Sequence, residues 1–104
     1  MSKLPKNYTY RPLPKELFIG FSDIEGNGLF AGEEIAKDTN LGISHKLVGN
    51  ELIRLPLGGF INHSKEENCT FVEKGDLVYL YTLKNIEVDE ELVLDYNKYI
   101  CNIK

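Results

Sequence analysis

The chain has 104 residues and a mass of 11.9 kDa, which suits one hydrophobic core and excludes a protein of several domains. Apolar residues make up 42% of the chain and charged residues 27%, so there is enough side-chain area for a packed core, and a wholly disordered chain is not expected. The formal net charge of −4 argues against a phosphate-binding surface. We therefore predict no direct contact with nucleic acid.

Charge is distributed unevenly along the chain. Lys3, Lys6, Arg11 and Lys15 all precede the first acidic residue, Glu16. The part of the chain that follows is acidic, which favours cationic partners through long-range attraction. The simpler interpretation, a solvated surface whose charge keeps the protein soluble, stays open at this stage.

The two cysteines, Cys69 and Cys101, are too few for a disulfide framework and lack the paired spacing of a zinc site. We therefore expect a reducing compartment and no metal. No apolar run of signal-peptide length follows the basic N-terminus, and none approaches the ~20 apolar residues that a membrane span requires. The sequence predicts a soluble intracellular protein, cytoplasmic or nuclear.

The first half of the chain contains an arm and several short strands. Prolines restrict the backbone of residues 1–15 and disfavour a helix, so we predict an extended arm before a domain of residues 16–104. Alternating apolar residues Leu17, Ile19 and Phe21 predict the first strand. A glycine-containing turn over residues 23–28, a strand over 29–31, a charged surface connection over 33–40 and a strand over 41–44 follow.

The second half is also predicted to be rich in strands. The expected strands are residues 51–55, ending before Pro56; residues 69–73 and 76–82, a hairpin joined by Lys74-Gly75; and residues 92–95, after an acidic turn. Only the tail, with Tyr96, Tyr99, Ile100 and Ile103, shows helical spacing. The sequence therefore predicts a mostly β domain of several small sheets with a short helical or irregular tail.

Three segments combine glycine, polar and aromatic residues in patterns that suit a functional site. They are Gly26-Asn27-Gly28-Leu29-Phe30-Ala31, Asn62-His63-Ser64 with Asn68-Cys69, and Glu90-Glu91-Leu92-Val93-Leu94-Asp95-Tyr96. A Gly-x-Gly turn lets a ligand approach the backbone, but alone it is more often a plain tight turn. An Asn-His pair alone is more often a hydrogen-bonded loop, and a lone tyrosine is more often half-buried packing.

Together and in this order, the segments resemble the SET-domain family of S-adenosylmethionine-dependent protein lysine methyltransferases, over roughly residues 16–99. The family pattern is Gly-x-Gly-Leu/Val-Phe-Ala, then Asn-His-Ser-x-x-Pro-Asn-Cys, then Gly-Glu-Glu-Leu-x-x-Asp-Tyr. Glu67 replaces the usual proline and Asp89 the usual glycine, which affects local turns. The insert around residues 46–57 is short, and the chain ends eight residues after Tyr96 without the cysteine-rich zinc segment of many relatives.

The resemblance implies a β-clip fold whose C-terminal strand is threaded, like a pseudoknot, through the loop that carries the Asn-His block. The implied cofactor, S-adenosylmethionine, would be held by Gly26, Asn27, Gly28, Asn62 and His63. Asn62 would offer its side-chain carbonyl to the cofactor's ammonium, and His63 would contribute its backbone rather than its imidazole. Tyr99 is the candidate for packing on the adenine, with packing against the core as an equal alternative.

Tyr96 is the implied catalytic residue, which would orient the amine, assist proton removal and polarise the methyl group. The substrate lysine must react in its neutral form although its free pKa is about 10.4. An apolar channel and the positive sulfonium both lower that pKa. Phe71 and Leu94 are the implied channel residues; because neither is tyrosine, we expect the channel to tolerate multiple methylation.

The implied partner is a lysine-containing protein or peptide, such as a histone, bound as an extended strand, and hence a chromatin-associated or cytoplasmic role. A homodimer is also plausible, because a second subunit could complete the wall that the short insert leaves open. One alternative is a SET-like binding module that binds cofactor or a lysine-rich peptide without turnover. A second alternative, a hydrolase that uses Cys69 and His63, lacks an evident third group.

Overall fold

The computed structural model describes residues 13–98. Its elements are β1 (Leu17–Phe21), β2 (Asn27–Ala31), β3 (Asn40–Val48), β4 (Glu51–Arg54), α1 (Pro56–Gly59), β5 (Asn62–His63), β6 (Cys69–Lys74), β7 (Leu77–Thr82), β8 (Glu91–Leu94) and the 3₁₀ helix η1 (Tyr96–Lys98). Most of the predicted arm and the end of the tail, including Tyr99, lie outside the described residues. Within residues 13–98 no helix has the length and apolar character needed to cross a membrane.

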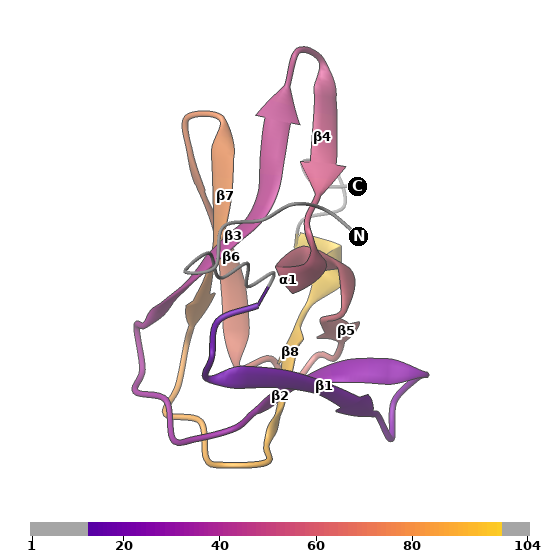
Figure 1. The fold of residues 1–104 in the computed structure, drawn as a ribbon, viewed down its shortest axis with the longest axis vertical. Helices are drawn as coiled ribbons and strands as arrows, with labels where there is room; N and C mark the ends of the chain where they lie inside the picture. The colour runs from indigo at the N-terminus through magenta and orange to yellow at the C-terminus, as the bar shows by residue number, and fades with distance from the viewer. Residues whose placement is uncertain (1–12, 99–104) are drawn as a thin grey trace, which may run out of the picture.

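The strands form two four-stranded sheets (Figure 1). In the first, of order β1-β2-β8-β5, β2 pairs antiparallel with β1 and β8, whereas β5 and β8 are parallel. The second, of order β4-β3-β7-β6, is antiparallel throughout. Its hairpins β3–β4 and β6–β7 extend away from β1 and β2, toward the top of Figure 1. The parallel pair matters for function because it aligns two segments that are distant in sequence.

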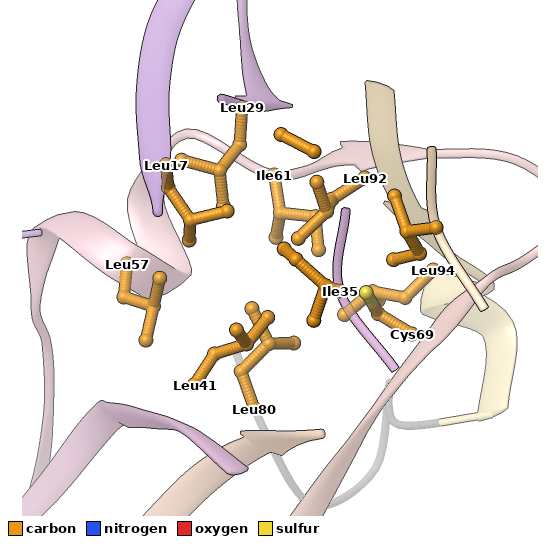
Figure 2. Packing of buried hydrophobic residues seen from close by; sticks show 12 residues of the cluster. Leu17, Leu29, Ile35, Leu41, Leu57, Ile61, Cys69, Leu80, Leu92 and Leu94 are labelled. Atoms are coloured by element: carbon orange, nitrogen blue, oxygen red, sulfur yellow. The ribbon is translucent and has the colours of Figure 1, made fainter. Parts of the chain in front are cut away.

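The hydrophobic core is built from both sheets and the connections between them (Figure 2). Side chains alternate between the faces of a strand, so each strand contributes every second residue. The buried cluster consists of Leu17, Leu29, Ala31, Ile35, Leu41, Leu57, Ile61, Cys69, Leu80, Ile86, Leu92 and Leu94. Burying one such leucine contributes about 2 kcal/mol. This core fixes the ends of β2, β5 and β8, which carry the polar residues of the candidate site.

The prediction of a mostly β domain of several small sheets is confirmed, with local differences. β3 extends beyond the predicted residues 41–44 because it pairs with β7 at one end and with β4 at the other. The β6–β7 turn consists of Gly75 and Asp76, one residue later than predicted, because Lys74 still pairs with Leu77. Gly75 has a φ of +62°, which favours glycine.

Two elements were not predicted from the sequence. The single turn of α1 begins at Pro56, a residue suited to the first helical position because it has no N–H to satisfy. β5 contains only Asn62 and His63 and exists through its pairing with β8. That pairing gives the proximity that the threaded topology implies, while the threading itself stays a prediction.

Candidate active site

The parallel β5–β8 pair brings the Asn-His segment beside the C-terminal tyrosine. Asn62 pairs with Val93 and His63 with Leu94. Tyr96 begins η1, just after β8 ends at Leu94, and its ring centroid lies 5.4 Å from that of His63. The three residues that the resemblance implies should meet are therefore neighbours in the fold.

Two hydrogen bonds fix Tyr96 at both ends. Its hydroxyl donates to the carbonyl oxygen of Ile61, and its backbone N–H donates to Nδ1 of His63 over 3.0 Å. Burial raises the pKa of the Tyr96 phenol; the positive charge of Arg54 lowers that pKa, and the negative charge of Glu25 raises it further. A phenol with a raised pKa is neutral at neutral pH, so Tyr96 keeps its proton for hydrogen bonding.

The His63 imidazole has a structural contact that fixes its tautomer. Because Nδ1 accepts the Tyr96 N–H, it carries a lone pair, and the proton of the neutral ring is on Nε2. The Asp95 carboxylate lies 3.8 Å from the same Nδ1, which is too far for a hydrogen bond. His63 therefore orients the backbone of Tyr96 through its ring.

Asn62 connects β5 to the glycine turn. Its Nδ2 donates to the carbonyl oxygens of Glu25 at 3.2 Å and Asn27 at 3.4 Å, and to Oε2 of Glu91 at 2.9 Å. These bonds direct the amide nitrogen toward the turn. Its Oδ1 accepts no hydrogen bond from residues 13–98, so this oxygen is available to a donor.

Glu91 and Ser22 complete this network, and the sequence analysis did not assign either to the site. The Ser22 hydroxyl donates to the Glu91 carboxylate, with distances of 2.9 and 2.8 Å to its two oxygens. A Cβ placed on Gly28 would lie 2.3 Å from Glu91 Oε2. Gly28 is thus required by the Glu91 carboxylate, which occupies the space beside its Cα. The Glu90-Glu91 pair in the third segment was the sequence feature that could have indicated a role for Glu91.

The glycine turn itself adopts a backbone conformation that suits glycine. Gly26 has a φ of +48°, in the region that L side chains rarely occupy. Its carbonyl oxygen accepts the Ser22 N–H at 2.8 Å, which closes the turn between β1 and β2. Gly28 already belongs to β2, so only the first glycine lies in the turn. The backbone carbonyls on either side of Gly26, those of Glu25 and Asn27, therefore face Asn62.

The other predicted site residues lie deeper in the fold. Leu94 is fully buried in the core, and Phe71 is partly buried and packs against it. The assignment of both to a lysine channel stays a prediction. Cys69 is also fully buried, and burial, together with the negative charges of Glu90 and Glu67, raises the pKa of its thiol to about 12. A thiol with that pKa is a poor nucleophile at neutral pH, which weighs against the hydrolase alternative.

Comparison with known families identifies the fold. The family model for the SET domain matches residues 42–97. The chain belongs to the SET-domain family. The matched residues include Asn62, His63 and Tyr96, whereas the glycine turn precedes them. A sequence search of curated proteins gave no significant match.

Three solved structures illustrate the same fold. A candidate histone methyltransferase of Plasmodium falciparum has a TM-score of 0.64 and 23% identity, over 81% of this SET domain and 95% of that chain. The methyltransferase domain of human PR domain-containing protein 2 has a TM-score of 0.61 and 19% identity, over 79% of this chain and 77% of that chain. Polycomb repressive complex 2 of Chaetomium thermophilum, bound to S-adenosylmethionine, has a TM-score of 0.63 and 19% identity, over 81% of this chain but only 15% of that chain. At these identities the likeness establishes the fold.

Proposed function

We propose that this SET domain is an S-adenosylmethionine-dependent protein-lysine N-methyltransferase with Tyr96 as its catalytic residue. The β5–β8 pairing carries the proposal, because it joins the Asn62-His63 segment to Tyr96 while Asn62 contacts the glycine turn. All three motif segments thereby surround one location. SET-domain membership and the methyltransferase neighbours support the same reaction class.

The donor set fits the amino-acid end of the cofactor. Gly26, Asn27, Gly28, Asn62 and His63 would hold it, and the free Oδ1 of Asn62 is the acceptor that an ammonium group needs. The carbonyls of Glu25 and Asn27 are already occupied by the Asn62 amide, so the turn is held in place before binding. When bound, S-adenosylmethionine supplies a methyl group activated by its positive sulfur.

Tyr96 acts in this proposal through position and hydrogen bonding. Its hydroxyl is held at Ile61 and its backbone at His63, so little conformational freedom is lost when a substrate amine arrives. The raised pKa keeps the phenol protonated, and a neutral phenol can orient the amine without trapping it as a salt-bridged ammonium. In this proposal Phe71 and Leu94 form apolar walls of the lysine channel, which favour the neutral form of lysine that must react. Because neither residue is tyrosine, the channel accommodates a lysine that carries more than one methyl group.

The substrate in this proposal is a lysine in a protein, a histone being one example. The excess of acidic over basic residues, sixteen against twelve, favours a cationic segment through long-range attraction. A homodimer and a place of action on chromatin or in the cytoplasm are further parts of the proposal. Gel filtration at assay concentration tests the dimer; a fully active monomer would remove it.

Calorimetry followed by an activity assay tests the proposal against the binding-module alternative. We expect S-adenosylmethionine to bind the wild type, Asn62→Ala to weaken binding by about tenfold through loss of a hydrogen bond to a charged group, and Tyr96→Phe to leave binding intact. Methylated lysine, detected by mass spectrometry in wild-type reactions with histones or cell lysate, supports the enzyme. Cofactor binding without any methylated product would favour the binding module instead.

A further inference from the structure

Arg54 is a cation beside the catalytic tyrosine that no motif of the sequence explains. It is the last residue of β4 and pairs with His45 of β3. Its Nε lies 3.8 Å from the position of a Cβ on Gly59, at the end of α1. Two residues later, the carbonyl of Ile61 accepts the Tyr96 hydroxyl. The guanidinium therefore lies against the short turn that leads to the partner of the catalytic phenol.

Arg54 has no partner of its own in the described part of the chain. Its side chain is exposed. Within residues 13–98 no carboxylate lies within ion-pair distance of its guanidinium, and no hydrogen bond joins it to another residue. Its charge nevertheless reaches the site, since it lowers the pKa of Tyr96 against the effect of burial. Because solvent screens an exposed charge, this effect on the phenol is small. An arginine that is unpaired in an acidic chain is available to an incoming anion.

His45, which pairs with Arg54 on β3, does not carry a charge that could neutralise the guanidinium. His45 is buried, with 2% exposure, and its Nδ1 lies 2.9 Å from the Ser44 hydroxyl oxygen. The Ser44 hydroxyl donates its only proton to the carbonyl of Val78, so the His45 ring donates from Nδ1 to the Ser44 oxygen. Burial and the charge of Arg54 both lower the pKa of His45. The His45 imidazole beneath Arg54 is therefore uncharged at neutral pH, so it neither pairs with the guanidinium nor repels it.

The position of the guanidinium is set by rigid backbone. Leu55, which follows Arg54, donates its N–H to the carbonyl of Ser44 at 2.9 Å, and its own carbonyl accepts from Gly58 and Gly59 at 2.9 Å each. A Cβ on Gly58 would lie 2.8 Å from His45 Cε1, so α1 packs directly on the imidazole. The backbone at the base of the β3–β4 hairpin is therefore held rigidly, and the planar guanidinium of Arg54 presents its N–H donors to solvent beside the site.

We propose that Arg54 recognises a carboxylate of the protein substrate, from an aspartate or glutamate close in sequence to the lysine that is methylated. The inference rests on the proposed function and specifies its substrate class. A guanidinium matches a carboxylate with two parallel hydrogen bonds, which gives geometric selectivity as well as affinity. The overall acidic surface attracts a cationic segment, and Arg54 selects within it a lysine that has an acidic neighbour.

A charge-reversal experiment on matched peptides tests this proposal. Peptides share one central lysine and carry Glu, Gln or Lys at single positions within about three residues on either side. The R54E variant is compared with wild type and with K46E, a control of equal charge change. Lys46 is exposed and pairs with Ile53, next to Arg54 on β4, so strand alternation places it on the opposite face of the hairpin.

For wild type and K46E we expect kcat/KM to be about tenfold higher for the best Glu peptide than for its Gln and Lys counterparts, and for R54E we expect this preference to reverse. Equal rates for all peptides with wild type would overturn the inference. The carboxylate of S-adenosylmethionine is the other group that the Arg54 guanidinium could bind in the same way. A tenfold weaker Kd of R54E for S-adenosylmethionine, with the peptide preference unchanged, would assign Arg54 to the cofactor and overturn the substrate assignment.

Peptide binding separates this inference from the proposed activity. Fluorescence anisotropy of labelled peptides, measured without turnover, reports on Arg54 even when no methyl is transferred. A Glu preference in binding that R54E reverses, with no methylated product, supports the role of Arg54 and contradicts the enzyme. Methylation without any charge preference in rate or binding supports the enzyme and contradicts the role of Arg54.

Discussion

Replacing Gly28 by alanine probes the network that joins the glycine turn to Asn62. The new Cβ would lie 2.3 Å from Oε2 of Glu91 and 3.0 Å from the Cβ of Ser22. Gly28 is not among the residues with positive φ, so alanine can adopt its backbone conformation. The substitution therefore acts by displacing the Glu91 carboxylate, which loses its hydrogen bonds to Ser22 and Asn62.

The expected cost follows from those lost bonds. Hydrogen bonds to a charged group contribute about 1.5–3 kcal/mol each. Because the network is partly exposed, we take about 2.5 kcal/mol for the loss of both partners of the Glu91 carboxylate together. Reduced freedom of the unfolded chain returns about 0.5 kcal/mol when glycine becomes alanine. We expect Gly28→Ala to lower the free energy of unfolding by about 2 kcal/mol, which corresponds to a fall in Tm of about 10 °C in a domain of this size.

A double-mutant cycle with Glu91→Ala gives the assay. In the Glu91→Ala background the obstructing carboxylate is gone, so Gly28→Ala should be nearly neutral in urea denaturation, with a coupling of about 1.5 kcal/mol or more. Gly59→Ala serves as the control glycine, since the nearest atom to its added Cβ is 3.8 Å away. Equal costs of Gly28→Ala in both backgrounds would refute the reasoning.

Four further results are expected elsewhere in the domain. In a Cys101→Ser protein, Cys69 should resist iodoacetamide at pH 8 until the chain unfolds, because its pKa is raised to about 12; fast labelling of the folded protein would contradict its burial. Asn68→Ala should cost about 2–3 kcal/mol in chemical denaturation, because Asn68 bonds to the Val93 N–H at 2.8 Å and the Glu91 carbonyl at 2.9 Å. The pKa of His45 is lowered on folding, so its contribution to stability is present above the unfolded pKa of about 6.5 and is lost as the pH falls below that value toward the lower folded pKa. Tm measured from pH 7.5 to 5 should therefore fall less in His45→Gln than in wild type. Gly75→Ala should lower Tm by a few degrees and Gly75→Asn by less, because φ is +62° there.

Strand identity and fold class could be predicted from the sequence, because alternation and turn residues are local signals. The β6–β7 hairpin was predicted to within one residue at its turn, where the register of Lys74 with Leu77 decides which residues remain unpaired. β5 could not be predicted, since two residues carry no periodicity and their strand conformation comes from β8. The full length of β3 likewise depends on partners on both sides.

The candidate site shows the same division between local and non-local information. Asn62, His63 and Tyr96 were predicted from motif order, and the structure places them side by side, while their roles stay predictions. Glu91 lay within the third segment but was given no role, and Ser22 lay outside all three segments, because their importance comes from a contact between residues 69 positions apart. Arg54 escaped it because it belongs to the short insert, where no motif indicates which side chain faces the site.

Transfer of a tritiated methyl group from S-adenosylmethionine to protein lysine, compared between wild type and Tyr96→Phe at equal protein and cofactor concentrations, tests the central claim most directly. Removing the hydroxyl that is held at Ile61 deletes the proposed positioning group while keeping the ring against His63. The account predicts incorporation by wild type and a fall of about 100-fold or more in Tyr96→Phe, with unchanged cofactor affinity. Equal incorporation by the two proteins would contradict it.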